Sequence, residues 1–173
     1  MKSVLKTAAL IPALFAAVSF STYSSANAES RISVFLVAQH SNKCAQVHGG
    51  GMENGAAITQ WDCVNQPNVI WDVILKSTAA GTYILKAHNS NKCAQVNDES
   101  LSNGAVISQW DCVKQANVRW MLVDAGGGAF YIKNQESEKC MQVNGGSFDN
   151  GAAITQWDCV DQPNVKWVMQ SAN

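Results

Sequence analysis

The stretch Ser-Asn-Lys-Cys-Ala-Gln-Val, residues 41–47, is the one around which the whole chain is organised. It recurs unchanged at residues 90–96 and returns as Ser-Glu-Lys-Cys-Met-Gln-Val at residues 137–143. The copies are offset by 49 and then 47 residues, a period typical of a supersecondary unit that stacks on copies of itself. The sequence therefore predicts one structural unit used three times.

Two further motifs repeat with the same offsets. Asn-Gly-Ala-Ala-Ile-Thr-Gln-Trp-Asp-Cys-Val fills residues 54–64, with counterparts at residues 103–113 and 150–160. Each unit closes with Asn-Val-x-Trp, at residues 68–71, 117–120 and 164–167. We therefore expect repeats over about residues 32–79, 80–127 and 128–173, with no room between them for a second domain.

The local sequence favours β-strands. Short runs of β-branched and aromatic residues are separated by Gly, Asn and Ser, and residues 29–173 show no sustained helical period. Each unit opens with one such run, at residues 35–37, 83–85 and 131–133. The pattern predicts an all-β fold of about twelve strands. A threefold pseudo-symmetric barrel with a hairpin cap, the β-trefoil, would close these strands without long free edges, whereas three units are too few for the alternative, a propeller.

The N-terminal segment has the features of a signal peptide. Lys2 and Lys6 precede an apolar stretch over residues 8–20, and Ala26-Asn27-Ala28 fits the small-x-small pattern of a cleavage site. The stretch is shorter than the roughly 20 residues that span a bilayer, which argues against an uncleaved anchor. We therefore expect a secreted protein, extracellular or periplasmic, whose mature chain begins at Glu29.

Removal of residues 1–28 would leave residues 29–173 as a single β-trefoil domain, long enough to bury a core. The loss of Lys2 and Lys6 reduces the 12 basic residues to 10, against 13 acidic residues, for a formal charge of −3. The sequence contains no cluster of Lys or Arg. Nucleic acid and anionic membranes are therefore not expected as partners, nor is membrane insertion.

Six cysteines in an exported chain indicate a disulfide framework. Two lie in each repeat, 19 residues apart, so a bridge within each repeat is the local pattern that respects the symmetry. A zinc site is disfavoured because there is no Cys-x-x-Cys and the three histidines are not placed as shared ligands. We expect no metal and no cofactor, and the bridges Cys44–Cys63, Cys93–Cys112 and Cys140–Cys159.

The expected bridges suggest how the strands of a repeat face one another. If Cys44 lies opposite Cys63 on an antiparallel hairpin, Gln46 falls opposite Trp61 and His48 opposite Thr59, all on one face. The equivalent pairs are Gln95–Trp110, Asn97–Ser108, Gln142–Trp157 and Asn144–Thr155. A flat apolar ring beside amide and hydroxyl groups suits a sugar, which has one C–H face and a rim of hydroxyls.

These motifs resemble those of the R-type, or ricin B-like, lectins. That family carries C-x-D-V, N-G-x-x-(V/I)-Q-x-W-x-C and N-Q-x-W, and the first repeat here has C-A-Q-V, N-G-A-A-I-T-Q-W-D-C and N-V-x-W. The likeness covers residues 32–173. It implies a β-trefoil with up to three shallow sites for galactose-type or related sugars.

The resemblance also implies roles for individual residues. The stacking aromatic falls on Trp61, Trp110 and Trp157, and the Asn that hydrogen-bonds sugar falls on Asn68, Asn117 and Asn164. This sequence departs from the family at three positions of each repeat. The Asp that binds sugar in the family is replaced by Gln46, Gln95 and Gln142, and the Gln two residues before the stacking Trp is replaced by Thr59, Ser108 and Thr155. The Gln of N-Q-x-W is replaced by Val69, Val118 and Val165. Charge-assisted hydrogen bonds are stronger than neutral ones, so replacement of Asp by Gln is expected to weaken a site or to change which sugar it binds, because Gln offers both an acceptor and donors.

Other recurring residues have structural roles in this interpretation. The closing tryptophans, Trp71, Trp120 and Trp167, are expected in the core. The glutamines that alternate onto the other face are expected to bond to the backbone, namely Gln60, Gln109 and Gln156. The aspartates that follow the stacking Trp either anchor a loop or touch ligand, namely Asp62, Asp111 and Asp158.

Two functions fit these residues. In one, Gln is the working residue of a variant sugar pocket, which the agreement of all three repeats at the Gln and the Trp favours. In the other, the trefoil has lost sugar binding and is a non-catalytic scaffold for a protein partner, as in a toxin subunit or an adhesin. Catalysis is not expected, because a triad using His40, His48 or His88 would break the threefold symmetry and has no flanking motif.

Overall fold

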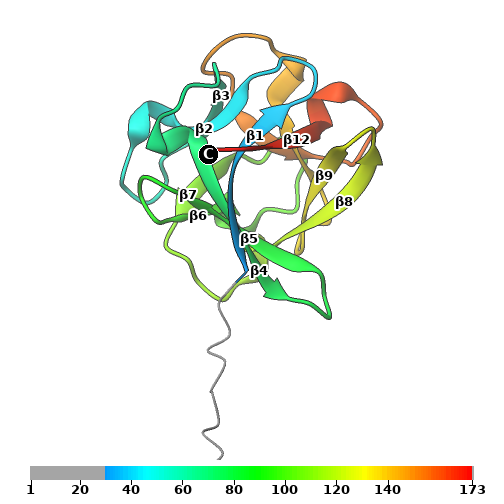
Figure 1. Ribbon diagram of the computed structural model, residues 1–173. Helices are drawn as coiled ribbons and strands as arrows, with labels where there is room; N and C mark the ends of the chain where they lie inside the picture. Colours follow the sequence, from blue (N-terminus) through cyan, green and yellow to red (C-terminus); the bar gives the residue numbers. More distant parts are fainter. Residues whose placement is uncertain (1–29, 173) are drawn as a thin grey trace, which may run out of the picture.

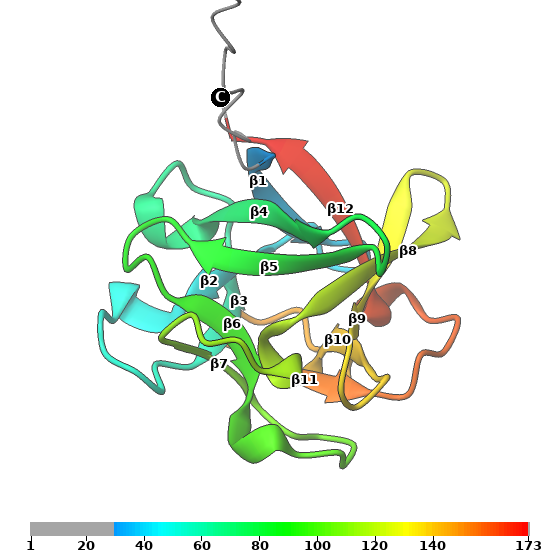
Figure 2. The same ribbon diagram turned by 90° about the horizontal axis from the view of Figure 1, so that it is seen from below.

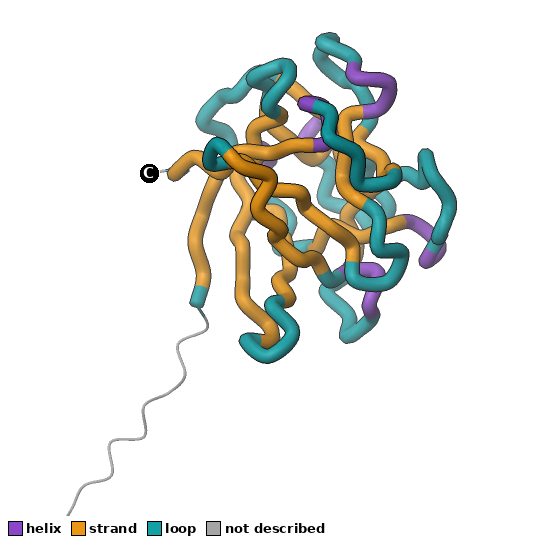
Figure 3. Tube along the Cα trace, turned by 90° about the vertical axis from the view of Figure 1, so that its right-hand side faces the viewer, coloured by secondary structure: helices purple, strands orange, loops and turns teal. Residues whose placement is uncertain are grey.

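The computed structural model describes residues 30–172, so the predicted signal peptide and its cleavage at Glu29 lie outside the described residues. The described part contains twelve strands and six short 3-10 helical turns, which lie among the loops (Figure 3). The strands are β1 (Arg31–Ala38), β2 (Cys44–Val47), β3 (Ile58–Trp61), β4 (Ile70–Ser77), β5 (Thr82–Ala87), β6 (Cys93–Val96), β7 (Ile107–Trp110), β8 (Trp120–Gly126), β9 (Ala129–Asn134), β10 (Cys140–Val143), β11 (Ile154–Trp157) and β12 (Lys166–Ser171). The helical turns are η1 (His48–Gly50), η2 (Pro67–Val69), η3 (Asn97–Glu99), η4 (Ala116–Val118), η5 (Asn144–Gly146) and η6 (Pro163–Val165).

Six of these strands close into an antiparallel barrel (Figure 1). β1 pairs with β4 and β12, β5 pairs with β4 and β8, and β9 pairs with β8 and β12. The other six form the hairpins β2–β3, β6–β7 and β10–β11, one in each repeat, gathered on one side of the barrel (Figure 2). This arrangement of three four-stranded units confirms the predicted β-trefoil.

The closing tryptophan of each repeat lies in the core, as predicted. Trp71, Trp120 and Trp167 are at most 1% exposed. Each indole N–H donates to a backbone carbonyl of its own repeat at 2.9–3.0 Å, so burial leaves no polar group of the ring unpaired. The burial of each ring stabilises the fold by about 1.5–3 kcal/mol.

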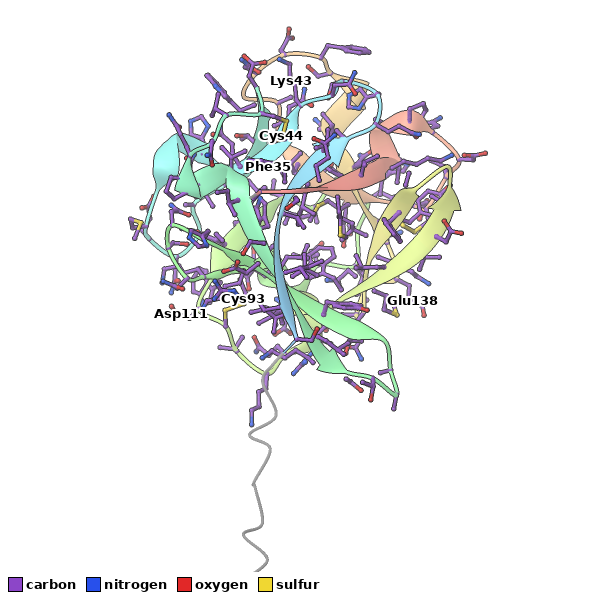
Figure 4. All side chains as sticks on the ribbon, viewed as in Figure 1. Phe35, Lys43, Cys44, Cys93, Asp111 and Glu138 are labelled. Carbon is purple, nitrogen blue, oxygen red and sulfur yellow. A yellow bond between two sulfur atoms is a disulfide. The ribbon has the colours of Figure 1, made fainter. Side chains whose placement is uncertain are left out.

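The three predicted disulfides are present, one in each repeat. Cα–Cα distances are 5.0–5.1 Å, and no cysteine is free among the described residues. Cys44 and Cys93, labelled in Figure 4, begin the first strand of two different hairpins. Each bridge therefore ties the start of a hairpin to the loop that follows it.

The register of the hairpins differs from the predicted one by two residues. Cys44 lies opposite Trp61 and Gln46 lies opposite Thr59, so the predicted pairing of Gln46 with Trp61 is wrong, as are its two equivalents. The reason is that β3 ends at Trp61, and Cys63 reaches back to its partner from beyond the strand end. A shift of two residues keeps every side chain on its face, so the predicted site face is retained.

The predicted opposition of His48 and Thr59 is wrong for the same reason. His48 begins the helical turn η1, and its backbone N–H donates to the carbonyl of Ala57 at 2.9 Å. The corresponding Asn97 and Asn144 begin η3 and η5. This residue therefore stands at the rim of the hairpin and not within its ladder.

The fully buried glutamines join neighbouring repeats. Gln60 Nε2 donates to the backbone carbonyls of Ser147 at 2.8 Å and Asp149 at 2.9 Å, while Gln60 Oε1 accepts from Ser41 Oγ at 2.9 Å. Gln109 and Gln156 make the same bonds into the preceding repeat. The prediction that these side chains bond to the backbone is confirmed, and each of them fastens the loop of another repeat.

Candidate functional site

A shallow hollow lies beside the first hairpin, where the end of β3 meets η1 and η2. It has a volume of about 340 Å³ and is lined by Gln46, His48, Gly49, Gly50, Trp61, Gln66 and Asn68. The third repeat has a hollow of about 540 Å³ at the equivalent positions, lined by Gln142, Asn144, Gly145, Gly146, Trp157, Gln162 and Asn164. Both hollows bring together predicted site residues from β-strands and helical turns that the sequence keeps apart.

The predicted stacking tryptophans are exposed. Trp61, Trp110 and Trp157 are 39%, 42% and 40% exposed, in contrast to the buried tryptophans of the barrel. Each stands at the last position of its strand, after three buried residues, where the ladder ends and the ring turns toward solvent. An exposed indole at the same position of every repeat offers a flat apolar surface that the core does not use.

The predicted Gln, Thr and Asn of a site form a chain of hydrogen bonds. In the first repeat, Gln46 Nε2 donates to Thr59 Oγ1 at 3.3 Å, and Asn68 Nδ2 donates to Gln46 Oε1 at 3.0 Å. Asn68 Nδ2 also donates to the carbonyl of Val47 at 3.1 Å. The third repeat has the same three bonds, at 3.2, 3.1 and 3.1 Å. The Asn amide group therefore holds the Gln side chain in place, and the Gln carbonyl is matched to an N–H donor.

This chain explains what Gln does where the resembling family has Asp. One lone pair of Gln46 Oε1 is used by Asn68, and one Nε2 hydrogen is used by Thr59. A second lone pair and a second N–H remain on the same side chain, so it can both accept from and donate to a ligand hydroxyl. The lining of the hollow contains amide, imidazole and indole groups and no carboxylate.

The middle repeat is built differently. Asn117 Nδ2 still donates to Gln95 Oε1 at 3.2 Å and to the carbonyl of Val96 at 3.1 Å. Ser108 Oγ, however, donates to Asn97 Oδ1. Asn117 is also only 3% exposed, whereas Asn68 and Asn164 are partly exposed. The three predicted sites are thus not equivalent.

Two parts of the hollows were not among the predicted site residues. Gln66 and Gln162 line them from the residue just before η2 and η6, and the glycine pairs of η1 and η5 also line them. The signal was present in the repeats, because Gln recurs two residues before the site Asn in all three. The glycine pairs recur only in the first and third repeats.

The recurring aspartates hold loops and do not line the hollows. Asp62 accepts from Lys43 Nζ of its own repeat at 2.5 Å and from Asn150 Nδ2 of the third repeat at 2.8 Å. These two hydrogen bonds, the one from Lys43 first, lower the pKa of Asp62 below its ordinary value. Asp111, labelled in Figure 4, and Asp158 are held in the same way. Of the two roles considered for these residues, the structure supports the loop anchor.

Residues 30–172 contain no group of three or more His, Cys, Asp or Glu side chains arranged to hold a metal ion. Within the same residues, no helix has the length and apolar character needed to cross a membrane.

The barrel and its three capping hairpins define a β-trefoil. The sequence profile of the family described as "Ricin-type beta-trefoil lectin domain-like" matches residues 20–110, 70–157 and 116–173, and the chain belongs to this family. The resemblance drawn from the sequence is confirmed. No curated protein matches the chain.

Solved structures of the same fold include designed and natural proteins. The designed threefold-symmetric protein ThreeFoil is 29% identical over 79% of this chain and 96% of its own, with a TM-score of 0.77. The exo-β-1,3-galactanase 1,3Gal43A of Clostridium thermocellum is 26% identical over 80% of this chain and 30% of its own, with a TM-score of 0.76. The Macrolepiota procera ricin B-like lectin, solved with lactose, has a TM-score of 0.67 at 12% identity, over 80% of this chain and 94% of its own.

Proposed function

We propose that the protein is a secreted lectin that binds sugars against its exposed tryptophans without chemically changing them. The observation that carries this proposal is the division of the six tryptophans into two sets, one buried and one about 40% exposed, with Trp61 and Trp157 of the exposed set lining polar hollows. A flat apolar ring that recurs at the same exposed position, beside groups that can hydrogen-bond, suits a ligand with one apolar face and several hydroxyls.

The chemistry of the first hollow suits a pyranose. The C–H face of the sugar would stack on Trp61, and its hydroxyls would meet the free hydrogen-bonding positions of Gln46 and the amide of Gln66. The hollow is shallow and small, so a single monosaccharide should bind only weakly, around millimolar. Several sites on one domain would raise the strength of attachment to a surface that carries many glycans.

The relatives support the class of ligand. The Macrolepiota procera lectin was solved with lactose, and 1,3Gal43A is a galactanase whose chain includes a domain of this fold. Galactose-containing glycans are therefore the first ligands to try. Because Gln replaces the family's Asp in all three repeats, the sugar that this protein prefers has to be identified by experiment.

A second candidate function, attachment to a protein partner, rests on another observation. Met52, Leu101 and Phe148 occupy the same position in the three repeats and are 57%, 61% and 64% exposed. Exposed apolar side chains repeated by symmetry are one feature of protein-binding surfaces.

A glycan array of the oxidised protein separates the two candidates. Replacement of Trp61, Trp110 and Trp157 by Ala should abolish binding to the array while circular dichroism shows an intact fold. The matched control replaces Met52, Leu101 and Phe148 by Ser, and it should keep its array signal. A blank array for a folded, fully bridged protein would reject the sugar-binding proposal and favour a protein partner.

Export is a separate part of the proposal. Expression of residues 1–173 in a host with a secretory pathway should release a protein whose N-terminus, read by mass spectrometry, is Glu29. Retention of the full-length chain inside the cell would show that the N-terminal segment is not a signal peptide.

A further inference from the structure

The middle repeat departs from the other two in the helical turn beside the site. Where the first and third repeats have Gly49-Gly50 and Gly145-Gly146, the middle repeat has Asp98-Glu99. The backbone is the same in all three, with φ between 52° and 70°. Residues other than glycine rarely adopt this left-handed conformation, and two in succession are rarer still. Strain of this kind is often kept where a side chain has a function.

In the third repeat, the second residue of the pair lies beside the site Asn. A Cβ added at Gly146 would lie 3.8 Å from Cγ and 3.9 Å from Cβ of Asn164, in ordinary van der Waals contact. At Gly50 an added Cβ would have no atom within 4 Å. The middle repeat carries Glu99 at this position, on a backbone of similar φ, and this side chain is exposed at the surface.

Asn117 shows the effect expected of such a cover. It is 3% exposed, and its Oδ1 is buried without a hydrogen-bond partner. Its Nδ2 makes the same two bonds as in the other repeats, so the side chain has not turned away. A buried carbonyl without a partner is unfavourable, and a ligand hydroxyl can relieve it only if it reaches the atom.

We infer that Glu99 closes the middle site, so that the first and third repeats bind sugar and the second does not. This inference rests on the proposed lectin function and adds the number of working sites to it. Trp110 then remains exposed without a complete polar wall, because Asn117 is covered and Ser108 is held by Asn97. The domain is bivalent, and Glu99 is the residue that sets its valence.

The six indole N–H groups provide a test that reads each site separately. In ¹⁵N-labelled, oxidised protein titrated with lactose and then with a β-1,3-linked galactose disaccharide, the signals of Trp61 and Trp157 should shift. The signal of Trp110 should stay in place at concentrations that saturate the other two. The buried indoles of Trp71 and Trp120 serve as references within the same sample.

Two reciprocal variants test the role of Glu99 directly. In Glu99→Gly, Trp110 should respond with a midpoint within about threefold of the other sites, and the Asn117 side-chain amide should exchange with solvent as fast as that of Asn68. In Gly146→Glu, Trp157 should lose its response while Trp61 keeps it. Glu99→Ala retains Cβ and separates the effect of Cβ from that of the carboxylate.

The outcomes are distinguishable. A shift of Trp110 in the unmodified protein, with the same midpoint as Trp61, overturns the inference and leaves the lectin proposal standing. A Glu99→Gly protein in which Trp110 still does not respond, and Asn117 exchange is unchanged, also overturns it. If no exposed indole responds to either sugar and the glycan array is blank, the lectin proposal fails and the inference fails with it.

Discussion

Asn150 of the third repeat donates its side-chain amide to Asp62 of the first repeat at 2.8 Å, across 88 residues of sequence. Asn54 reaches Asp111 and Asn103 reaches Asp158 in the same way, at 2.9 and 2.8 Å. Each bond runs from the Asn-Gly turn of one repeat to the loop after the exposed Trp of another. The three bonds form a closed ring, so the loop after each exposed Trp is held from outside its own repeat.

The ring of aspartates makes the stability of the fold depend on pH. Hydrogen bonds, with Lys43 first for Asp62 and Asn54 first for Asp111, lower the pKa of these carboxyls in the folded protein. A carboxyl with a lowered pKa contributes stability above its unfolded pKa, and that contribution is lost as the pH falls through the folded value. Urea midpoints should therefore drop between about pH 5 and pH 2.

The matched control is the triple variant Asp62→Asn, Asp111→Asn and Asp158→Asn, which cannot titrate at these positions. It should be less stable than the unmodified protein at pH 7 and should lose less stability in acid. Equal acid sensitivity of the two proteins would show that other carboxyls cause the loss.

Each disulfide should contribute to stability mainly by restricting the unfolded chain. A bridge between cysteines 19 residues apart is worth about 3 kcal/mol in the chain-entropy estimate. Replacement of Cys93 and Cys112 by Ala should lower the free energy of unfolding by about that amount, measured by urea denaturation. Because the symmetry makes the three bridges equivalent, removal of Cys44 and Cys63 should cost about the same, and a cost near zero would contradict the estimate.

Gln60 should be far more important for stability than an exposed Gln of the site. Gln60→Ala would remove a fully buried side chain that donates to the backbone carbonyls of Ser147 and Asp149, and would open a cavity, for a loss of about 2–4 kcal/mol. Gln66→Ala removes an exposed side chain and should change unfolding by less than about 0.5 kcal/mol. In a sugar-binding assay the order of the two effects should reverse, and the Gln66→Ala protein should bind sugar more weakly than the Gln60→Ala protein.

The two tryptophans of one repeat should separate folding from binding. Trp71→Ala removes a ring that is 1% exposed and should destabilise the protein by about 3–5 kcal/mol. Trp61→Ala removes a ring that is 39% exposed and should leave the thermal midpoint within a few degrees while reducing array binding. A large drop in the thermal midpoint for Trp61→Ala would mean that this ring packs against the wall and has no role in a site.

Much of the fold could be predicted from the repeats, because each sequence pattern occurs three times and all three copies must fit the same structural unit. The constant spacing of Cys44 and Cys63 in each repeat predicted the bridges, and the different local contexts of Trp61 and Trp71 predicted which ring is exposed and which is buried. The register of the hairpin could not be read in this way. A disulfide has enough reach to join a residue beyond the end of a strand, so Cys63 was a misleading reference point.

By itself, the sequence determined the number of repeats, the fold, the bridges and the types of side chain that gather at each site, because all of these are encoded in the spacing of residues within one unit. Only the tertiary structure decided how the units meet and which of the recurring side chains are buried. Gln60 and Asn150 act on other repeats, and Asn117 is 3% exposed although its repeat carries the same Asn-Val-x-Trp motif as the two repeats in which the Asn is partly exposed. Such contacts exist only once the chain has closed on itself, since they join residues that no local pattern connects.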